Sequence, residues 1–473
     1  MRKSIAVILV LVFLTASCLV VAKPAFSSAD VEDTWASKAP MHEARGGLGV
    51  AAVNGKIYAI GGSTLQGSPP YTGGIVATNE EYDTATDTWV FKKPMPTPRM
   101  DFGIAVYNNK IYCIGGEEIF KDDSKAPLTN VNEVYDPVTD TWETKAPMPT
   151  PRSGLRANVV NGKIYLIGGN DPNVHFEPGA SPHNEVYDPA TDSWTTKTPM
   201  LAAASNHASA VFGDKIYVIG GLIGGPSEGL RFDLNQIYDT EDDSWSYGTP
   251  VPFNVVGEAG ATTGVNAPKR IYVFGEIWDF GEDHKYSVRV YDPESDSWAV
   301  GADIPTDRGG FGIAVVDDML HVIGGETADG IPFSADPPSI RKYATNEQYM
   351  PFGYGTVPPV VSVLSPENTN YTSGNVSLAF TVNKPAQWMG YSLDGQETVT
   401  VTGNTSIAVL SSGLHNITVY AKDEFENTGA SETISFSVAE EPEPFPTALV
   451  ATVSASVAVV GVGLLVYLKK RNR

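Results

Sequence analysis

The sequence PRSGLRANVVNGKIYLIGG occupies residues 151–169, and NEVYDPATDSW follows at residues 184–194. The first segment contains two apolar stretches around an Asn-Gly pair and ends in a double glycine. Asn-Gly pairs accept the positive φ that two-residue hairpin turns require, so these stretches are predicted to be paired strands. The second segment contains a third and a fourth short strand around the turn Asp-Pro-Ala-Thr-Asp. The unit is therefore predicted to be a sheet of four strands, which we call a, b, c and d.

This unit recurs along the chain. Tryptophans stand roughly 50 residues apart: Trp35, Trp89, Trp142, Trp194, Trp245 and Trp298. A Tyr-Asp pair precedes each of the last five by seven residues. Double glycines end strand b at 61–62, 115–116, 168–169, 220–221 and 324–325, whereas one copy reads Phe274-Gly275-Glu276. Because a four-stranded sheet cannot bury both faces alone, the repetition predicts a ring of sheets packed face to face.

In order, spacing and residue type, these units resemble the kelch repeat from about Asp30 to Tyr349. The resemblance implies an all-β fold, a six-bladed kelch β-propeller, and says little about function. The last unit ends at Tyr343-Ala344 without a tryptophan seven residues later. Trp35 precedes the first complete unit, so the simplest closure makes it the outer strand d of the last blade. In the alternative, Gln348-Tyr349 supplies that strand.

Composition excludes some classes of protein. The formal net charge is -23, which argues against nucleic acid as a partner because phosphate binding needs clustered Lys and Arg. Of the two cysteines, Cys18 lies in a leader segment, which leaves Cys113 alone, so no internal disulfide is expected. The seven histidines show no metal-ligand spacing, and neither a metal nor another cofactor is predicted.

Two apolar segments stand near the ends of the chain. Arg2-Lys3 and the run from Ile5 to Val21 have the pattern of a signal peptide, with an uncleaved anchor as the alternative. The segment 448–468 is long and apolar enough to span a bilayer, and basic residues follow it. These features predict that the body of the protein is extracellular. Pro442-Glu443-Pro444 before that segment also resembles a sorting signal, in which case the helix would be removed.

Between these segments, residues 360–438 show alternating apolar strands typical of a sandwich and resemble an immunoglobulin-like or fibronectin-like spacer. All N-x-Ser/Thr sequons fall here, which predicts a glycosylated stalk: Asn370, Asn375, Asn404 and Asn416. The predicted segments are a signal peptide (1–29), the propeller (30–355), the sandwich (356–439), a Pro/Glu linker (440–447), a transmembrane helix (448–468) and a basic cytoplasmic tail (469–473).

In such a meander, the long b–c loops and the d–a connections share one end of each blade, and binding residues usually lie on such loops. The b–c loops carry aromatic residues that suit sugar rings or peptides, although they could instead cover the blade tops. The predicted ligand-binding aromatics are Tyr71, Phe120, Phe176, Trp278, Phe280 and Phe333.

An arginine stands ten residues after the tryptophan in four units, which predicts a basic side to the channel mouth: Arg45, Arg99, Arg152 and Arg308. Units four and five have Ala204 and Val255 instead. In kelch adaptors similarly placed arginines contact acidic ligands, and the alternative is that each pairs with a nearby carboxylate. Carboxylates follow strand b at Glu117, Glu276 and Glu326.

The main functional hypothesis is a cell-surface binding protein whose partner is an extracellular glycan or protein. The kelch resemblance also implies an enzymatic alternative, since some six-bladed kelch proteins are sialic-acid mutarotases and kelch copper oxidases exist. A mutarotase needs an acid/base pair, for which Glu276 and Glu326 are weak candidates. An oxidase is disfavoured because Cys113 lies in the apolar stretch KIYCIGG. A structural part of the cell envelope is the third hypothesis.

Overall fold

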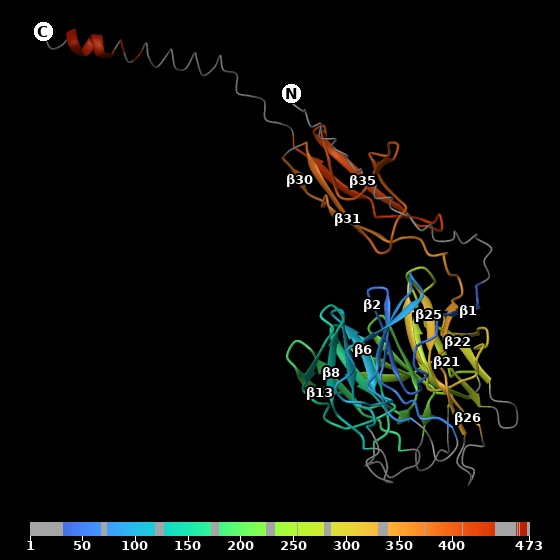
Figure 1. The fold of residues 1–473 in the computed structure, drawn as a ribbon. Helices are drawn as coiled ribbons and strands as arrows, with labels where there is room; N and C mark the ends of the chain where they lie inside the picture. Colours follow the sequence, from blue (N-terminus) through green and yellow to red (C-terminus); the bar gives the residue numbers. More distant parts are fainter. Residues whose placement is uncertain are drawn as a thin grey trace, which may run out of the picture. The chain divides into compact units, whose positions relative to one another are not determined.

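The structure is a computed structural model. It describes residues 32–67, 73–118, 127–171, 179–223, 232–252, 254–278, 285–329, 339–372, 374–408, 410–439, 460, 462 and 464–470. Among these residues strands dominate, and six four-stranded antiparallel sheets form the body of the fold (Figure 1). Each sheet is one blade, numbered here in chain order.

The strands of each blade run from the innermost to the outermost. Blades 1 to 3 are β2 (Gly49–Val53), β3 (Lys56–Ile60), β4 (Asn79–Asp83) and β5 (Thr88–Lys92); β6 (Gly103–Tyr107), β7 (Lys110–Ile114), β8 (Asn132–Asp136) and β9 (Thr141–Lys145); and β10 (Arg156–Val160), β11 (Lys163–Ile167), β12 (Asn184–Asp188) and β13 (Ser193–Thr196).

Blades 4 to 6 continue the ring. They are β15 (Ala208–Phe212), β16 (Lys215–Ile219), β18 (Asn235–Asp239) and β19 (Ser244–Tyr247); β20 (Asn254–Thr262), β21 (Ile271–Trp278), β22 (Lys285–Asp292) and β23 (Ser297–Val300); and β24 (Gly312–Val316), β25 (Met319–Ile323), β28 (Asn346–Met350) and β1 (Thr34–Lys38). Two short ribbons lie beside them, β14 (Ala204–Ser205) with β17 (Leu222–Ile223), and β26 (Glu326–Asp329) with β27 (Ser339–Lys342).

The blades close into a ring through their innermost strands. Strand β2 contacts β6 on one side and β24 on the other, and β10, β15 and β20 continue the sequence of neighbours. The apolar clusters lie between blades: Tyr82 and Trp89 of blade 1 pack with Ala314 and Ile323 of blade 6. Cys113 is fully buried in the next such cluster, as expected from its apolar surroundings. The predicted all-β propeller is confirmed.

The first strand of the described chain completes the last blade. Strand β1 pairs antiparallel with β28, with Trp35 opposite Tyr349. The predicted closure through Trp35 is therefore confirmed, and the alternative is wrong because Tyr349 lies in strand c. Tyr349 is the sixth repeat tyrosine, which the sequence disguises because Met350 replaces the usual aspartate.

A hydrogen-bonded clamp joins each blade to the preceding one. In blade 3, Asp192 Oδ1 accepts from the backbone N–H of Ala146 at 2.8 Å, and Trp194 Nε1 donates to the carbonyl oxygen of Ala146 at 2.9 Å. The same Asp192 oxygen accepts from Tyr187 Oη at 2.6 Å. The other clamps are Asp87 and Trp89 on Ala39, Asp140 and Trp142 on Lys93, Asp243 and Trp245 on Thr198, Asp296 and Trp298 on Thr249, and Asp33 and Trp35 on Ala302.

The clamp explains the fixed spacing of the repeat. The aspartate must adopt a positive φ to turn its carboxylate toward both partners, as at Asp192 with φ 50°. Hydrogen bonds from Tyr187 and the Ala146 backbone lower the pKa of the Asp192 carboxyl below its ordinary value. One two-residue step, Asp-x-Trp, thus satisfies both backbone groups of a single residue in the neighbouring blade.

A second all-β part follows the propeller in the chain. One sheet contains β29 (Val361–Ser365), β31 (Val376–Val382) and β34 (Thr405–Ile407). The other contains β30 (Asn370–Tyr371), β37 (Ile434–Val438), β35 (Gly413–Lys422), β32 (Trp388–Leu393), β33 (Val399–Val401) and β36 (Thr428–Ala430). Both sheets contribute to one apolar cluster, in which Leu378, Ile417 and Val419 are fully buried. Its relation to immunoglobulin-like or fibronectin-like domains and the domain boundaries stay predictions.

A buried ion pair lies within this second part. Lys384 Nζ is 2.8 Å from Asp423 Oδ2, and both side chains are about 2% exposed. Lys384 Nζ also donates to Asn266 Oδ1 at 3.3 Å and to the carbonyl oxygen of Val357. Three acceptors satisfy the buried ammonium, which offsets its loss of hydration.

The predicted membrane-spanning segment 448–468 falls mostly outside the described residues. Residues 464–470 are helical and exposed. Among the residues that the structure describes, no helix is both long enough and apolar enough to cross a membrane.

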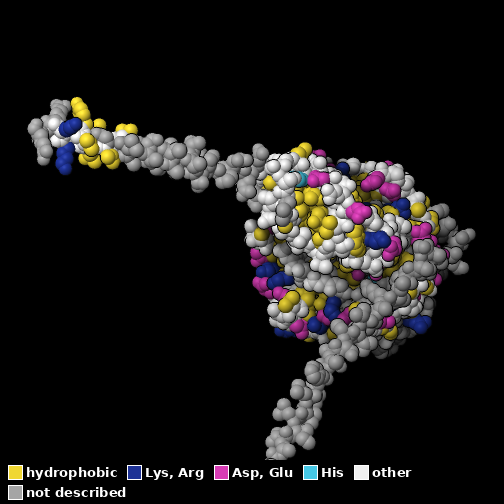
Figure 2. Space-filling view, turned by 90° about the horizontal axis from the view of Figure 1, so that it is seen from above, with side chains coloured by type: hydrophobic (Ala, Val, Ile, Leu, Met, Phe, Trp, Pro, Cys, Tyr) yellow, Lys and Arg dark blue, Asp and Glu magenta, His cyan; other side chains and the backbone are white. Residues whose placement is uncertain are grey.

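The face presented in Figure 2 carries acidic and basic side chains interspersed over the surface.

Candidate binding site at the mouth of the axial channel

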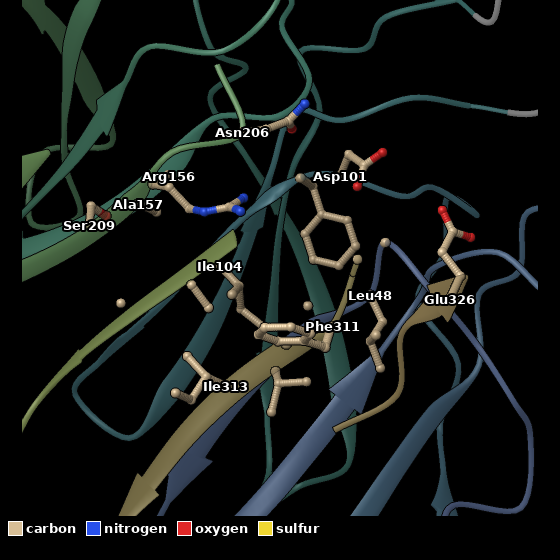
Figure 3. Close-up of a pocket in the computed structure, with 18 residues that line it drawn as sticks. Leu48, Asp101, Ile104, Arg156, Ala157, Asn206, Ser209, Phe311, Ile313 and Glu326 are labelled. Atoms are coloured by element: carbon tan, nitrogen blue, oxygen red, sulfur yellow. The ribbon is translucent and has the colours of Figure 1, made fainter. Parts of the chain in front are cut away.

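The innermost strands enclose a channel whose wall is made mainly of small side chains. Its middle section is a cavity of about 370 Å³, to which every blade contributes, for example Ala51, Ala105 and Ala210. A second cavity of about 360 Å³ opens at the end where each chain segment enters its innermost strand. This cavity is called the mouth here. Figure 3 shows its lining, which combines Asp101, Arg156, Asn206 and Glu326 with apolar side chains such as Phe311.

A belt of backbone hydrogen bonds runs around the mouth from blade 6 to blade 4. The N–H of Gly47 donates to Gly310 at 2.8 Å, and the N–H of Asp101 donates to Gly47 at 2.9 Å. The N–H of Gly154 then donates to Asp101 at 2.8 Å, and the N–H of Asn206 to Gly154 at 3.0 Å. Each link joins equivalent residues of adjacent blades, so the rim of the mouth is rigid.

All five belt residues have a left-handed backbone conformation. The φ angles are 63° at Gly47, 62° at Gly154 and 59° at Gly310, where glycine carries no steric cost. Asp101 and Asn206 adopt 54° and 48° although they have side chains. The six clamp aspartates use their positive φ to hold the preceding blade, but within the described part of the chain no side-chain hydrogen bond engages Asp101 or Asn206. Sequence reasoning missed both residues.

The mouth perturbs its titratable groups. Burial, with a contribution from Glu117, raises the pKa of the Asp101 carboxyl to about 6, while Arg156 and Lys342 oppose the shift. Burial lowers the pKa of the Lys342 ammonium to about 8. Lys342 also forms an ion pair with Glu326, whose carboxylate lines the mouth. Perturbed pKa values in a concave site are typical of functional residues.

The raised pKa of Asp101 predicts a stability penalty above neutral pH. Because the folded state holds this proton more tightly than the unfolded state, stability falls as pH rises from about 4 through about 6. The neutral isostere in Asp101→Asn should therefore raise the Tm by about 3 °C at pH 8 and leave it unchanged at pH 4. Thermal melts followed by circular dichroism at both pH values test this. Equal effects at the two pH values would contradict it.

The four predicted arginines lie elsewhere. Arg45, Arg99, Arg152 and Arg308 are each 0% exposed. Each guanidinium pairs with a glutamate of strand c in its own blade, as in Arg99 Nη1 to Glu133 Oε2 at 2.7 Å. The other pairs are Arg45 with Glu80, Arg152 with Glu185, and Arg308 with Glu347. The prediction of a basic channel mouth built from these arginines is wrong, because their charges are buried and neutralised inside the blades.

Each arginine also holds the end of strand b. Arg99 Nη2 donates to the carbonyl oxygen of Cys113 at 2.8 Å, and Arg308 Nη2 to that of Val322 at 3.1 Å. The pairing leaves a signal in the sequence. Blade 4 has Ala204 in place of the arginine and Gln236 in place of the glutamate, and blade 5 has Val255 and Arg289. Arginine and glutamate are therefore present together or absent together, which favours the carboxylate-pairing alternative.

The predicted carboxylates have different surroundings. Glu326 lines the mouth, and the predicted acid/base candidate is thus placed at the cavity. Glu117 accepts from Ser153 Oγ at 2.8 Å and acts on Asp101 through its charge. Glu276 lies in β21 opposite Tyr286 and has interaction partners of its own.

Most of the predicted loop aromatics lie outside the described residues: Tyr71, Phe120, Phe176, Phe280 and Phe333. Trp278 is the last residue of β21, and its side chain is not among those that the structure describes. Their role in binding stays a prediction. The sequon residues Asn370, Asn375, Asn404 and Asn416 are all exposed. Exposure makes them accessible to glycosylation, which likewise stays a prediction.

Comparison with known proteins agrees with the repeat pattern. The family model for the kelch motif matches residues 44–96, 98–149, 151–201 and 203–252. Kelch-like protein 36 of Bos taurus is 28% identical over 279 residues, which cover 58% of this chain and 42% of that protein. Kelch-like protein 25 of Xenopus tropicalis is 28% identical over 240 residues, covering 50% of this chain and 38% of that protein. The chain thus spans less than half the length of these curated relatives.

Among solved structures, one titled "Structure of YjhT" aligns with a TM-score of 0.48 and 18% sequence identity, covering 64% of this chain and 95% of that chain. The family match, the six four-stranded sheets and the interblade clamps all describe the same repeat. Residues 44–252 therefore match the kelch motif in four consecutive repeats, within a β-propeller of six four-stranded sheets.

Proposed function

We propose that this protein is a binding protein that presents the mouth of its axial channel, together with the b–c loops around it, to an extracellular glycan or protein. One observation carries the proposal. Asp101 and Asn206 adopt a backbone conformation that three other blades assign to glycine, and their side chains have no hydrogen-bond partner within the described residues. Glycine adopts this conformation without steric cost and aspartate or asparagine at a small one, so a polar side chain without a partner in the fold is expected to serve a ligand.

The topology supports the same face. The a–b and c–d connections are tight turns with positive φ residues, such as Asn161-Gly162 and Asp192. In each blade, strand b ends and strand c begins at the end where the mouth opens, and loops that leave a rigid scaffold in this way carry binding residues in many folds. Kelch repeats are consistent with an interaction scaffold.

The proposed location is the outer surface of a cell membrane. It rests on the signal-like segment 1–29, the apolar segment 448–468 with its basic tail, and the four exposed sequon asparagines. In this arrangement the second all-β part serves as a glycosylated stalk. Retention of the helix and its removal by a sorting enzyme are both compatible with an extracellular propeller.

The experiment that tests the proposal blocks the channel. Ala157 lines both cavities, so Ala157→Phe fills space that a ligand entering the mouth would occupy. The purified full chain in detergent should show saturable binding on an array of glycans and surface proteins, and Ala157→Phe should weaken it at least tenfold, about 1.4 kcal/mol. The control is Val138→Phe, because Val138 is 84% exposed on a c–d turn.

Two results would count against this function. Binding that Ala157→Phe leaves intact would move the site away from the channel. A blank array, together with self-assembly of the chain into ordered layers, would favour the structural role in a cell envelope.

A carbohydrate-active enzyme is the second candidate. The observation that favours it is Asp101, whose pKa of about 6 suits a general acid or base, in a mouth that also contains Arg156 and Glu326. Turnover of a sugar, followed by NMR as interconversion of its anomers, should then fall strongly in both Asp101→Asn and Glu326→Gln. Unchanged interconversion rates across a panel of reducing sugars would rule this candidate out.

A further inference from the structure

We infer that the mouth binds the terminal sugar unit of a neutral, hydroxyl-rich glycan, whose hydroxyl groups form hydrogen bonds with Asp101 and Asn206. This inference rests on the proposed function and specifies its ligand. The belt residues, the balance of charge and the shape of the cavity each support this ligand.

The belt holds the two polar side chains in fixed positions. The Asp101 carboxylate lies over Gly47 of the preceding blade, where its Oδ1 is 2.9 Å from the position that a Cβ would take. Asn206 Oδ1 lies over Gly154 in the same way, at 2.5 Å. A side chain on either glycine would collide with these oxygens. The glycines therefore make room for two polar groups that are pre-organised on hydrogen-bonded backbone.

The chemistry of the rim matches hydroxyl groups. Asp101 accepts hydrogen bonds, Arg156 donates them, and the Asn206 amide does both. Figure 3 shows these three side chains around the same opening. A hydroxyl group can donate to the carboxylate and accept from the guanidinium or the amide, so neighbouring hydroxyls on a sugar ring fit this order of groups. Phe102, Phe311 and Ile104 supply apolar lining for the C–H face of the ring.

The balance of charge favours a neutral ligand. The carboxylates of Asp101, Glu117 and Glu326 stand near the cations of Arg156 and Lys342, so the described rim already holds one negative charge in excess when Asp101 is ionised. A strongly charged ligand would bring an unmatched charge into a partly buried cavity, which costs free energy. A hydroxyl-bearing ligand adds none.

The shape of the cavity favours the end of a chain over its middle. Six innermost strands surround the channel, so the mouth, as far as the described residues line it, is a pit that continues along the channel axis. A glycan segment with continuing chain on both sides would have to leave over the rim, whereas a terminal unit can enter with its chain pointing to solvent. The volume of about 360 Å³ is at the small end of the range for ligand pockets.

Recognition by an ionised Asp101 makes binding depend on pH. The charged groups that face this carboxyl are Glu117, Arg156 and Lys342, with Glu326 beside the last. The pKa of Asp101 is about 6 in the free protein, and hydroxyl donors stabilise the ionised form. Affinity should therefore fall as pH decreases through 6, and bound sugar should shift the carboxyl titration of Asp101, followed by NMR, to lower pH.

The test uses methyl glycosides of neutral hexoses and N-acetylhexosamines as probes, with the full chain in detergent and isothermal calorimetry as the readout. Asp101→Gly and Asn206→Gly remove the side chains but keep the left-handed conformation, so the fold should persist. Each should weaken binding at least tenfold. The control is Asn54→Gly, which makes the same exchange at a left-handed residue in an a–b turn of β2–β3.

The outcomes separate this inference from the function on which it rests. Binding of a neutral glycoside that is lost in Asp101→Gly and kept in Asn54→Gly supports it. If no glycoside binds, or if Asp101→Gly binds as well as the unaltered chain, it is overturned. A protein or a charged glycan whose binding is blocked by Ala157→Phe would, in that case, leave the proposed function standing with a different ligand.

Discussion

Replacing both Asp33 and Trp35 by alanine is expected to release β1 and open blade 6. The pair clamps Ala302 of blade 5, and the Trp35 ring packs against Tyr349 with a centroid distance of 5.0 Å. Loss of the aromatic ring and of these hydrogen bonds should cost about 3 kcal/mol or more. Hydrogen exchange should show β1 and the β28 amides that face it nearly unprotected, while the β28 amides bonded to β25 and blades 2 and 3 keep their protection.

The matched control is the double replacement of Asp140 and Trp142, which removes the same clamp from Lys93 between blades 2 and 1. There the chain connects the two blades covalently, so stability should fall without selective opening. If the Asp33/Trp35 and Asp140/Trp142 double variants both lost protection equally in all blades, β1 would not be the strand that opens first.

The single substitution Arg152→Ala is expected to destabilise the protein by about 3–5 kcal/mol, because it leaves the buried Glu185 carboxylate without its cation. Blade 4 shows how the chain tolerates the absence of this pair. There Gln236 bonds both the N–H and the carbonyl oxygen of Ala202, at 2.9 Å each. The double variant Arg152→Ala, Glu185→Gln should therefore recover about 2 kcal/mol of the loss.

Urea denaturation of the single and double variants measures this coupling. Arg341→Ala is the surface control, since Arg341 is exposed beside the ring of Tyr343 and its loss should cost no more than about 1 kcal/mol. If Arg152→Ala lowered the free energy of unfolding no more than Arg341→Ala does, the buried pairing would be contradicted. A double variant Arg152→Ala, Glu185→Gln less stable than Arg152→Ala alone would contradict it too.

The ring itself was predictable because its signals are local. The Asn-Gly turns, double glycines and the Asp-x-Trp spacing each specify a short piece of backbone, and their repetition specifies the sheet. Trp35 could be assigned to the last blade because its segment lacks the strands a, b and c that directly precede the tryptophan in the other units. The sixth tyrosine, Tyr349, was missed because neither an aspartate nor a tryptophan follows it in the chain.

The site was less predictable because the direction of a side chain depends on packing. The sequence places Arg45 and its equivalents at the entry to strand a, and an exposed basic rim was one of two readings. Their partners stand more than 30 residues away in strand c, as with Arg152 and Glu185 (a separation of 33). Only the joint absence of both residue types in blades 4 and 5 indicates the contact.

The mouth residues left a different kind of signal. Asp101 aligns with Gly47, Gly154 and Gly310 of other blades, and Asn206 with the same set. An aspartate or asparagine where repeats carry glycine is easily taken as a tolerated left-handed residue. The structure adds that both side chains project into one cavity, which no pattern along a single repeat can show.

The pairing of β1 with β28 also fixes when the molecule can become complete. Asp33 and its partner Tyr349 are 316 residues apart. Among the described strands of the propeller, the ribosome therefore makes the outer strand of blade 6 first and the strand that pairs with it last. Until residue 350 has emerged, blades 1 to 5 form an open arc with two uncovered faces, and β1 has no sheet to join. Closing so long a loop carries an entropic cost, and the exposed faces invite association between nascent chains. The propeller can therefore close only after β28 has emerged, when the second all-β part is still to be made.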